Sequence, residues 1–469
     1  MRKLRRGGIQ RNRFANDGGS STRLREFHFA SGFSSPTGTQ AGYGHFMRHH
    51  PTSRPFLSGS DQFVSGDEPV GTTTVSSETY TVIPLNFRGT RMRLLVLYQA
   101  SNPEIDQPGY FEGFQRMVGE GRLSTHSGIG YFGVARERGW NALWDETYDT
   151  AKKMEADAIF LHFFHAEMPD PTQGILKIKS LPNRPIVFTS LGDGFGRWTH
   201  RIPKSFRVAS SLSDVSFLTG LGYQARQLAA WGSANLVLMP NGCCQVRFSS
   251  CHENANNEPE FHVAFIGSRI KSRNPAGHFF WTARKRVAFV DAMTRRFGKR
   301  FGLFGKGWEG YASWQGPIPY SQQHDAYRRS EIALGGTPNA SHDFYTSDRV
   351  FIAAASGVPL VDFWVPGVER ILMPGRDWWL GRDSDEMLGL AERLLEKPRE
   401  ERVALGREAR RQVLEHHTQY NRCVEMIAIV QDLRSARLKH VRAPEPKLEF
   451  LLKTIPGHPS LDAVLNWRG

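Results

Sequence analysis

Thr346-Ser-Asp-Arg-Val-Phe-Ile-Ala-Ala-Ala-Ser-Gly-Val-Pro-Leu-Val-Asp362 is the stretch that decides the fold. Serine and aspartate near its start can accept hydrogen bonds from the free amides of a first helical turn, which predicts a helix over 349–356. Gly357 then ends that helix, because glycine adopts the left-handed conformation without steric cost. The apolar residues 359–362 follow as a short strand buried on both faces. This order predicts one α/β unit of a parallel sheet.

Arg349 lies in the first turn of this predicted helix, directly after Ser347 and Asp348. Free main-chain amides attract anions at a helix start, and a guanidinium group binds two phosphate oxygens at once. The pattern therefore favours a diphosphate site here. The alternative is an α/β unit without a ligand, because such units are common.

The composition indicates a globular protein with more than one domain. The chain has 469 residues, which is more than one ordinary hydrophobic core supports, and 39% of them are hydrophobic. No apolar run reaches the roughly 20 residues that cross a bilayer. The first residues lack the apolar region of a secretory signal, so we expect a cytoplasmic protein, with an organelle transit peptide as the alternative.

Four cysteines do not suggest a disulfide framework in a chain of this length. Cys243, Cys244, Cys251 and His252 could be read as metal ligands. They lack the paired spacing of known zinc sites, so we expect no metal and no bound cofactor.

The net charge of +14 predicts attraction to polyanions. Nucleic acid, a phosphorylated substrate and an anionic surface all qualify as partners. The alternative is that the basic residues only keep the protein soluble, and that much of the positive excess lies in residues 1–13.

Two series of short apolar runs, separated by helical segments, predict two parallel sheets. The first series covers 94–98, 158–162, 185–189, 214–218 and 236–239. The second follows a polar linker at 251–260 and covers 261–266, 300–304, 331–334 and 359–362. We therefore expect an α/β protein of two Rossmann-like, doubly wound domains that face each other across a ligand-binding cleft.

The chain divides into five predicted segments. Residues 1–70 are rich in Gly, Ser, Thr and Arg, which indicates a flexible basic leader, and 72–87 suggest an edge hairpin. The segments are the leader at 1–70, an N-terminal acceptor domain at 71–258, a C-terminal donor-binding domain at 259–415, a bracing helix at 416–435 and a tail at 436–469.

The order of several motifs resembles the GT-B glycosyltransferases over residues 90–430, in particular the bacterial spore-maturation CgeB-like group. No single motif is decisive. The motifs are Phe265-Ile-Gly-Ser-Arg269, Gly305-Lys-Gly-Trp308, Ser347-Asp-Arg-Val-Phe351, Ala355-Ser-Gly-Val-Pro-Leu-Val361, His417-Thr-Gln-Tyr-Asn-Arg422 and, in the first domain, Leu238-Met-Pro-Asn-Gly242.

This resemblance implies that the second domain binds a nucleoside-diphosphate sugar, UDP-linked, as a substrate. The glycines would let the main chain approach the diphosphate, and the arginines would neutralise its charge. The implied donor-binding residues are Gly267, Ser268, Arg269, Gly305, Lys306, Ser347, Asp348 and Arg349.

One departure from the family pattern concerns the donor ribose. Relatives carry a glutamate that binds the ribose hydroxyls where this chain has Ile352. The acidic residue that many retaining relatives carry falls at Phe344, with Asp343 beside it as a substitute. Isoleucine cannot accept a hydrogen bond. A degenerate protein that binds without catalysis is therefore an alternative.

The acceptor side offers several candidates for a catalytic base. They are Asp193 in Ser190-Leu-Gly-Asp-Gly194, and His162, His165 and Glu167 in Leu161-His-Phe-Phe-His-Ala-Glu167. We favour Asp193 and then His165, although a turn aspartate or a packed histidine would show the same pattern.

The sequence thus predicts a metal-independent glycosyltransferase that moves a sugar from a nucleoside-diphosphate donor to an acceptor hydroxyl. In one alternative the acceptor is modified DNA, bound through the basic residues. In the other the protein is a non-catalytic binding module.

Overall fold

The structure is a computed structural model that describes residues 91–196, 201–249, 258–269, 281–336, 342–451 and 463–469. The predicted leader and the edge hairpin lie outside these residues, and so do most of the linker, Cys251 and His252.

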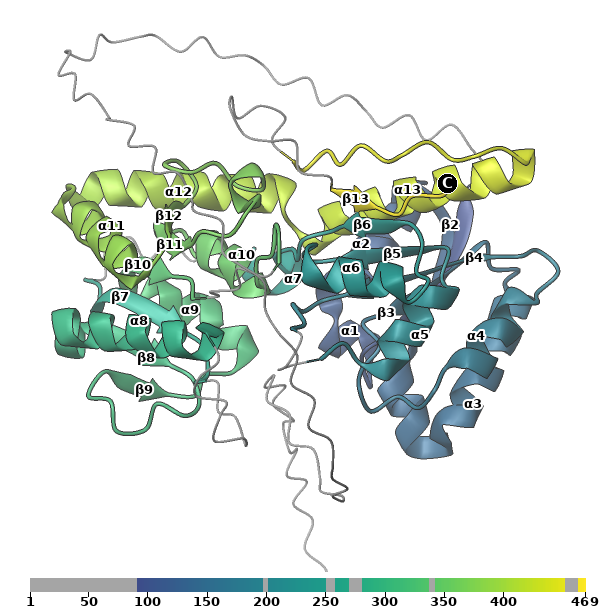
Figure 1. The fold of residues 1–469 in the computed structure, drawn as a ribbon, viewed down its shortest axis with the longest axis horizontal. Helices are drawn as coiled ribbons and strands as arrows, with labels where there is room; N and C mark the ends of the chain where they lie inside the picture. Colours follow the sequence, from purple (N-terminus) through teal and green to yellow (C-terminus); the bar gives the residue numbers. More distant parts are fainter. Residues whose placement is uncertain (1–90, 197–200, 250–257, 270–280, 337–341, 452–462) are drawn as a thin grey trace, which may run out of the picture. The chain divides into compact units, whose positions relative to one another are not determined.

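The first lobe is built on a seven-stranded sheet with the order β13-β6-β5-β4-β3-β1-β2 (Figure 1). Its strands are β1 (Met92–Tyr98), β2 (Leu123–Gly130), β3 (Ala158–His162), β4 (Ile186–Leu191), β5 (Val215–Leu218), β6 (Leu236–Leu238) and β13 (Val464–Leu465). All pairs are parallel except β13 with β6. Every residue of β3, β4 and β5 is buried, as expected for parallel strands covered on both faces.

Helices connect these strands and cover the sheet (Figure 1). They are α1 (Pro103–Asp106), α2 (Pro108–Gly119), α3 (Tyr131–Lys153), α4 (Thr172–Lys179), α5 (Lys204–Leu212), α6 (Tyr223–Ala230) and α7 (Gln245–Phe248). The α3 helix is interrupted at Gly139, where φ is 85°.

The second lobe is built on a six-stranded sheet with the order β12-β11-β10-β7-β8-β9, and all its pairs are parallel. Its strands are β7 (Phe261–Ile266), β8 (Phe301–Phe304), β9 (Trp314–Gly316), β10 (Ser330–Leu334), β11 (Leu360–Phe363) and β12 (Trp379–Gly381). Its helices are α8 (Trp281–Phe297), α9 (Gln323–Arg328), α10 (Asp348–Ala355), α11 (Ser384–Glu396) and α12 (Arg399–His416).

Both sheets reverse their strand order once. In the first sheet β1 lies between β2 and β3, and in the second β7 lies between β8 and β10. Ligands of such sheets bind outside the carboxyl ends of the strands at this reversal. The predicted fold class, two doubly wound α/β sheets, is confirmed.

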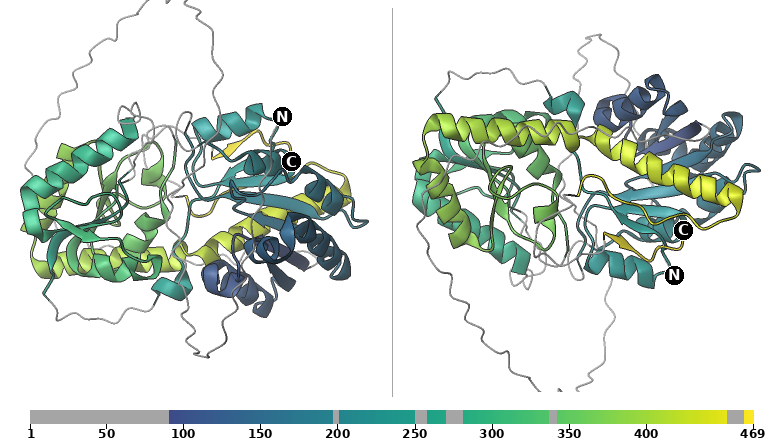
Figure 2. Two further views of the ribbon diagram at one scale, coloured as in Figure 1. Left: turned by 90° about the horizontal axis from the view of Figure 1, so that it is seen from below. Right: turned by 90° about the horizontal axis from the view of Figure 1, so that it is seen from above.

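Two helices follow one another near the end of the chain. Thr418 begins α13 (Gln419–Lys439) with a capping box that includes Asn421. Figure 2 shows α12 along the second lobe and α13 along the first, and α13 packs against α2 and β4. The helix extends four residues beyond the predicted boundary at 435, since Lys439 is its last residue.

The predicted tail belongs to the first lobe. Val464 and Leu465 form β13, and the Trp467 indole donates to the Ala443 carbonyl at 3.1 Å. A two-residue strand is too short to produce a periodic signal, and the polar edge strand β2 was missed because it lacks an apolar run.

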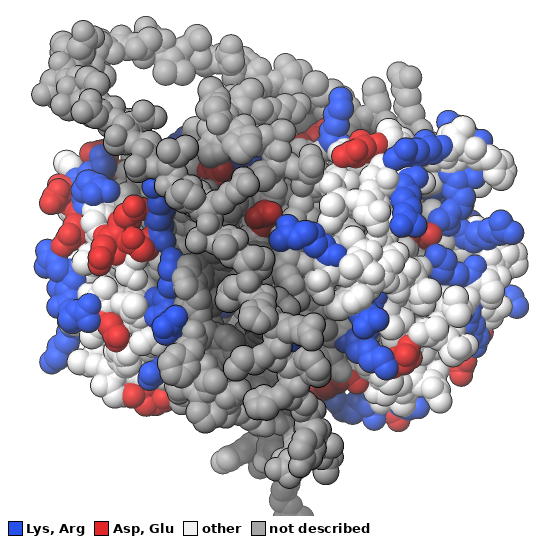
Figure 3. Space-filling model, viewed as in Figure 1, with Lys and Arg blue, Asp and Glu red and all other residues white. Residues whose placement is uncertain are grey.

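No helix of the described ranges is long and apolar enough to cross a membrane. On the face shown in Figure 3, lysines and arginines form several separate groups over both lobes, with acidic side chains between them.

Candidate functional site

Two glycine-containing loops follow β7 and β8 and are joined by main-chain hydrogen bonds. The Gly267 amide donates to the Phe304 carbonyl at 2.9 Å, and the Arg269 amide donates to the Lys306 carbonyl at 2.9 Å. The Lys306 amide also donates to Ser268 Oγ at 3.4 Å. Because β7 and β8 are parallel neighbours, both loops leave the sheet at the same edge. The structure therefore brings the predicted donor residues of the two loops together.

Gly305 is where these loops approach most closely. Its φ is 130°, and a Cβ added there would lie 2.5 Å from the Gly267 carbonyl oxygen, so only glycine fits. The Trp308 indole donates to the Gly267 carbonyl at 2.7 Å, and the Trp314 indole donates to the Gly305 carbonyl at 2.8 Å. These two indoles fix the loops, a role that sequence analysis did not find.

The start of α10 matches its prediction in detail. Ser347 is the N-cap, and its hydroxyl accepts from the Arg349 amide at 3.2 Å. Gly357 follows the helix with a φ of 81°, as predicted for its end. Arg349 is half-buried. Burial alone would lower the pKa of Arg349, but the charge of Asp348 and those of more distant groups outweigh it and raise the pKa.

Arg286 of α8 is the main residue that sequence analysis missed. Its side chain is buried, Nη1 donates to the Ser268 carbonyl at 3.0 Å, and Nε donates to the Gly336 carbonyl at 3.1 Å. In the sequence it follows Arg284 and Lys285, and such a run is typical of a solvated helix face. Only the packing of α8 shows which of the three basic side chains points inward.

Arg286 and Arg349 form a pair of like charges. Burial and, to a lesser extent, the positive charge of Arg349 lower the pKa of Arg286 to about 10, against the opposing effects of Tyr345 and Asp362. Two cations in a poorly hydrated place repel each other and are stabilised by an anion between them. The arrangement is therefore suited to a phosphate or diphosphate.

The loop after β10 completes this edge of the second sheet. A Cβ added to Gly335 would lie 2.1 Å from the carboxylate carbon of Asp362, and one added to Gly336 would lie 2.2 Å from the Phe265 ring. Asp362 is buried, and its Oδ1 accepts from the Phe363 amide at 2.8 Å. The two glycines thus keep space at the reversal point between β7 and β10, where the Gly336 carbonyl receives Arg286.

Asp193 lies in the loop after β4 of the first lobe and is exposed. Its charge acts on Arg349 and on Tyr345 of the second lobe. Burial raises the pKa of the Tyr345 hydroxyl, and the Gly194 main chain partly opposes that shift. Asp193 is therefore within electrostatic range of Arg349 at the start of α10.

His165 has a different environment. It is half-buried, its ring lies 5.5 Å from the Phe132 ring, and Nδ1 accepts from the Glu167 amide at 3.2 Å. Burial lowers the pKa of His165, and the Glu167 charge partly opposes that shift. These neighbours all belong to the first lobe.

The hypothesis that His162 is a base is wrong. Its side chain is fully buried, with ring centroids 4.0 Å from Phe163 and 4.7 Å from Tyr110. Burial among these rings lowers the pKa of His162 to about 3. It is a core residue, because its strand ends beneath aromatic side chains and not at the surface.

The side chains at the two positions where the resembled family carries acids cannot accept a hydrogen bond here. Ile352 is fully buried in α10, and Phe344 is fully buried with a φ of 63° and its amide donating to the Pro366 carbonyl at 2.6 Å. A buried carboxylate, Glu369, lies on the same loop as Pro366, and sequence analysis did not single it out. Asp343 is half-buried beside Phe344.

Within the described ranges, no group of three or more His, Cys, Asp or Glu side chains could hold a metal ion. Cys243 and Cys244 are buried, and burial raises the pKa of both thiols.

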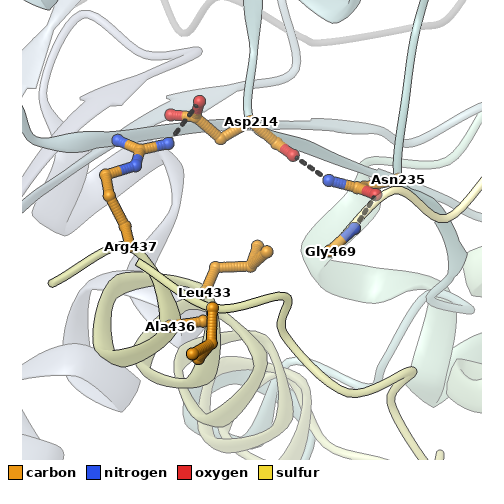
Figure 4. A pocket seen from close by; sticks show the side chains of 7 residues that line it. Asp214, Asn235, Leu433, Ala436, Arg437 and Gly469 are labelled. Carbon is orange, nitrogen blue, oxygen red and sulfur yellow. Dashed lines mark hydrogen bonds and ion pairs between the residues drawn. The ribbon is translucent and has the colours of Figure 1, made fainter. Parts of the chain in front are cut away.

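A cavity of about 250 Å³ lies at the opposite end of the first sheet, where β5 and β6 begin (Figure 4). Arg437 points at Asp214 with a contact of 2.7 Å, and the Gly469 amide donates to Asn235 at 3.3 Å. These polar groups bind one another, and the bond from Gly469 attaches residues 463–469 to the sheet.

Residues 284–428 match the protein-family model described as "Glycosyl transferase-like". This stretch contains Arg286 and the whole of α10, and it spans about a third of the chain. No curated protein matches the sequence significantly.

Several solved structures are similar in fold at low identity. A sucrose-phosphate synthase from Thermosynechococcus elongatus matches with a TM-score of 0.49 and 12% identity, over 74% of this chain and 100% of that one. HepE from Anabaena, in complex with UDP and glucose, matches with 0.44 and 13%, over 72% and 99%. BGT from phage T4, in complex with UDP-glucose, matches with 0.44 and 12%, over 72% and 99%. We base the function on the residues of this chain and on the matched family model.

Proposed function

We propose that this protein is a glycosyltransferase that moves a sugar from a nucleoside-diphosphate donor to an acceptor hydroxyl. The observation that carries the proposal is the buried Arg286 next to Arg349 at the start of α10, joined to the glycine loops by the Ser268 carbonyl. A diphosphate between the two guanidinium groups would remove their mutual repulsion. The match of this stretch to a glycosyl transferase-like family supports the same function.

The proposed reaction breaks the bond between the anomeric carbon of the sugar and the β-phosphate oxygen. The electron pair of that bond stays on the diphosphate, whose new negative charge Arg349 and Arg286 stabilise. The acceptor oxygen forms the new bond to the anomeric carbon, and its proton moves to Asp193. A base from the first lobe beside a phosphate site from the second is the arrangement that this reaction needs.

We propose further that the reaction needs no metal ion, because the two arginines and the α10 amides supply the positive charge. Activity should then be the same with and without a chelator. A requirement for a divalent cation would contradict this part of the proposal.

A donor panel tests the function directly. The full chain is heated with UDP, UDP-glucose, UDP-N-acetylglucosamine or GDP-mannose, and UDP or GDP release measures donor hydrolysis. A ligand at about 100 times its Kd stabilises the folded protein by about 2.7 kcal/mol, which raises Tm by several degrees. If none of these compounds changes Tm or is hydrolysed, the proposal is wrong. Binding without hydrolysis would leave the non-catalytic alternative.

Arg286→Met makes this test specific. Replacing this buried cation with an apolar chain of similar length removes its repulsion with Arg349 but leaves the Ser268 and Gly336 carbonyls without their donor, so urea unfolding first measures the stability of the ligand-free variant. The same change should abolish the Tm shift by UDP. Arg296→Ala on the same helix is the control, because Arg296 is exposed, pairs with Glu392 and lies over the Phe297 ring.

A further inference from the structure

Residues 342–349 belong to the second lobe and also contact the first. His342 Nε2 lies 2.8 Å from the Phe195 carbonyl oxygen, and the Leu221 amide donates to the Asp343 carbonyl at 2.9 Å. Tyr345 packs so closely on Gly220 that a Cβ added there would lie 2.8 Å from the tyrosine Cβ. The segment is therefore in contact with the ends of both β4 and β5.

These contacts reach the loop at 192–196, which carries Asp193. The first lobe holds the two ends of that loop, because Asn241 donates to the Gly192 carbonyl at 3.1 Å and Gln224 accepts from the Phe195 amide at 3.0 Å. The second lobe also acts on the middle of the loop: burial raises the pKa of the Tyr345 hydroxyl, and the Gly194 main chain partly opposes that shift. Asp193 thus sits between a fixed end and a contact with the other lobe.

The main-chain conformation at Phe344 directs the Phe344 side chain to one side and those of His342 and Tyr345 to the other. A φ of 63° is strained for a bulky side chain. The hydrogen bond from the Phe344 amide to the Pro366 carbonyl and the contact of its ring with Gly367 hold the residue in this conformation. Phe344 consequently packs into the second lobe, while His342 and Tyr345 face the first.

His342 does not change its charge near neutral pH. Burial, with a smaller effect of the charge of Arg226, lowers the pKa of His342 to about 4, against the opposing effect of the Phe195 carbonyl. The neutral ring must carry its proton on Nε2 in order to donate to that carbonyl.

We propose that His342 and Tyr345 are positioning residues that hold the loop at 192–196, so that Asp193 faces the reacting atoms beside Arg349. The inference rests on the proposed function, and it adds that the diphosphate site and the base are connected through the short segment between Tyr345 and Arg349. A donor that orders the start of α10 would then also order the base.

Tyr345→Phe tests the hydroxyl without removing the ring. Hydrolysis of the donor that wild type turns over best in the panel should fall at least about tenfold, while the Kd for UDP stays within about threefold, because misplaced groups reduce turnover more than ground-state binding. Tyr420→Phe is the matched control: it loses a hydroxyl bond to Glu120 on the outside of the first lobe, and its turnover should equal that of wild type.

His342 allows a test by partial rescue. His342→Gln keeps an N–H donor at the end of the side chain, whereas His342→Leu removes it. Turnover should be higher in the glutamine variant than in the leucine variant, at equal affinity for UDP. Similar losses in both variants, accompanied by lower Tm, would show a structural role only.

Hydrogen exchange provides a readout that is independent of turnover. Adding UDP to wild type should slow amide exchange in the peptide that spans 191–196, and Tyr345→Phe should abolish this effect. The inference is overturned if UDP protects the peptide equally in both proteins, or if Tyr345→Phe hydrolyses donor like wild type. A wild type that binds no donor would instead refute the proposed function itself.

Discussion

The carboxyl edges of the two sheets carry sites of different construction. In the second lobe the edge consists of glycine loops, a helix start and guanidinium groups, which are defined by main-chain geometry and charge. In the first lobe the edge offers only scattered side chains, and burial decides among them: Asp193 is exposed, His165 half-buried and His162 fully buried. A phosphate site built from main-chain groups can be predicted from the sequence. A catalytic base cannot, because it is defined by the direction in which one side chain points.

The largest effect should come from the second lobe. Arg349→Ala removes the cation that we propose to stabilise the leaving group, and removal of such a group typically slows catalysis about 10²–10³-fold. Steady-state donor hydrolysis and UDP affinity should both fall. An Arg349→Ala variant with turnover near wild type would place the diphosphate elsewhere.

The two candidate bases of the first lobe should differ in effect. Asp193→Asn should lower turnover about 10²-fold or more with unchanged UDP affinity, because general-base catalysis contributes about 10²–10⁴-fold. His165→Asn should change turnover only slightly, because its ring packs against Phe132 and accepts from the Glu167 amide within the first lobe. Steady-state kinetics of the two purified variants distinguish the candidates. A larger loss of turnover in His165→Asn than in Asp193→Asn would make His165 the base.

Gly305→Ala should weaken UDP binding about tenfold, because strain at a positive φ costs about 1–3 kcal/mol and the added Cβ would displace the Gly267 carbonyl. Gly310→Ala is the matched control. Its φ of 100° is similarly strained, but a Cβ there meets nothing within 4 Å. Calorimetric titration with UDP should show wild-type affinity for the control, and equal losses in both variants would mean that the loop contact is unimportant.

The smallest effect concerns the core of the first lobe. The folded-state pKa of His162 is about 3, below its ordinary value of about 6.5, so the unfolded chain binds a proton that the folded protein does not. This group therefore lowers stability as pH falls from about 6.5 towards 3, by about 2 kcal/mol between pH 7 and pH 5. His162→Leu should remove that loss and should be nearly neutral at pH 7, because no described group hydrogen-bonds the ring nitrogens.

Urea unfolding at the two pH values measures this difference. His416→Gln, an exposed histidine on α12, is the control and should keep the wild-type pH dependence. If His162→Leu has the same pH dependence as wild type, the buried ring is not the source of the acid sensitivity.

Particular elements show how far the sequence could be interpreted. The α10 unit was predicted with its N-cap, its end and its following strand, because Ser347, Gly357 and the apolar run act locally. The pairing of the loops at Gly267 and Gly305 followed from the order of the strands. Arg286 was not found, since its neighbours in sequence give no sign of its burial, and β13 was not found because its two residues depend on a partner strand about 230 positions away in the chain.

The sequence by itself determined the two parallel sheets and the cationic start of α10, since helix caps, glycine conformations and apolar runs depend on neighbours within a few residues. Only the tertiary structure decided which basic residue of α8 is buried, that His162 belongs to the core, and that the charge of Asp193 acts on Arg349. Those facts depend on packing between residues far apart in the chain. Neighbouring positions of a helix or strand face different sides, so a shift of one position moves a side chain from solvent to the interior.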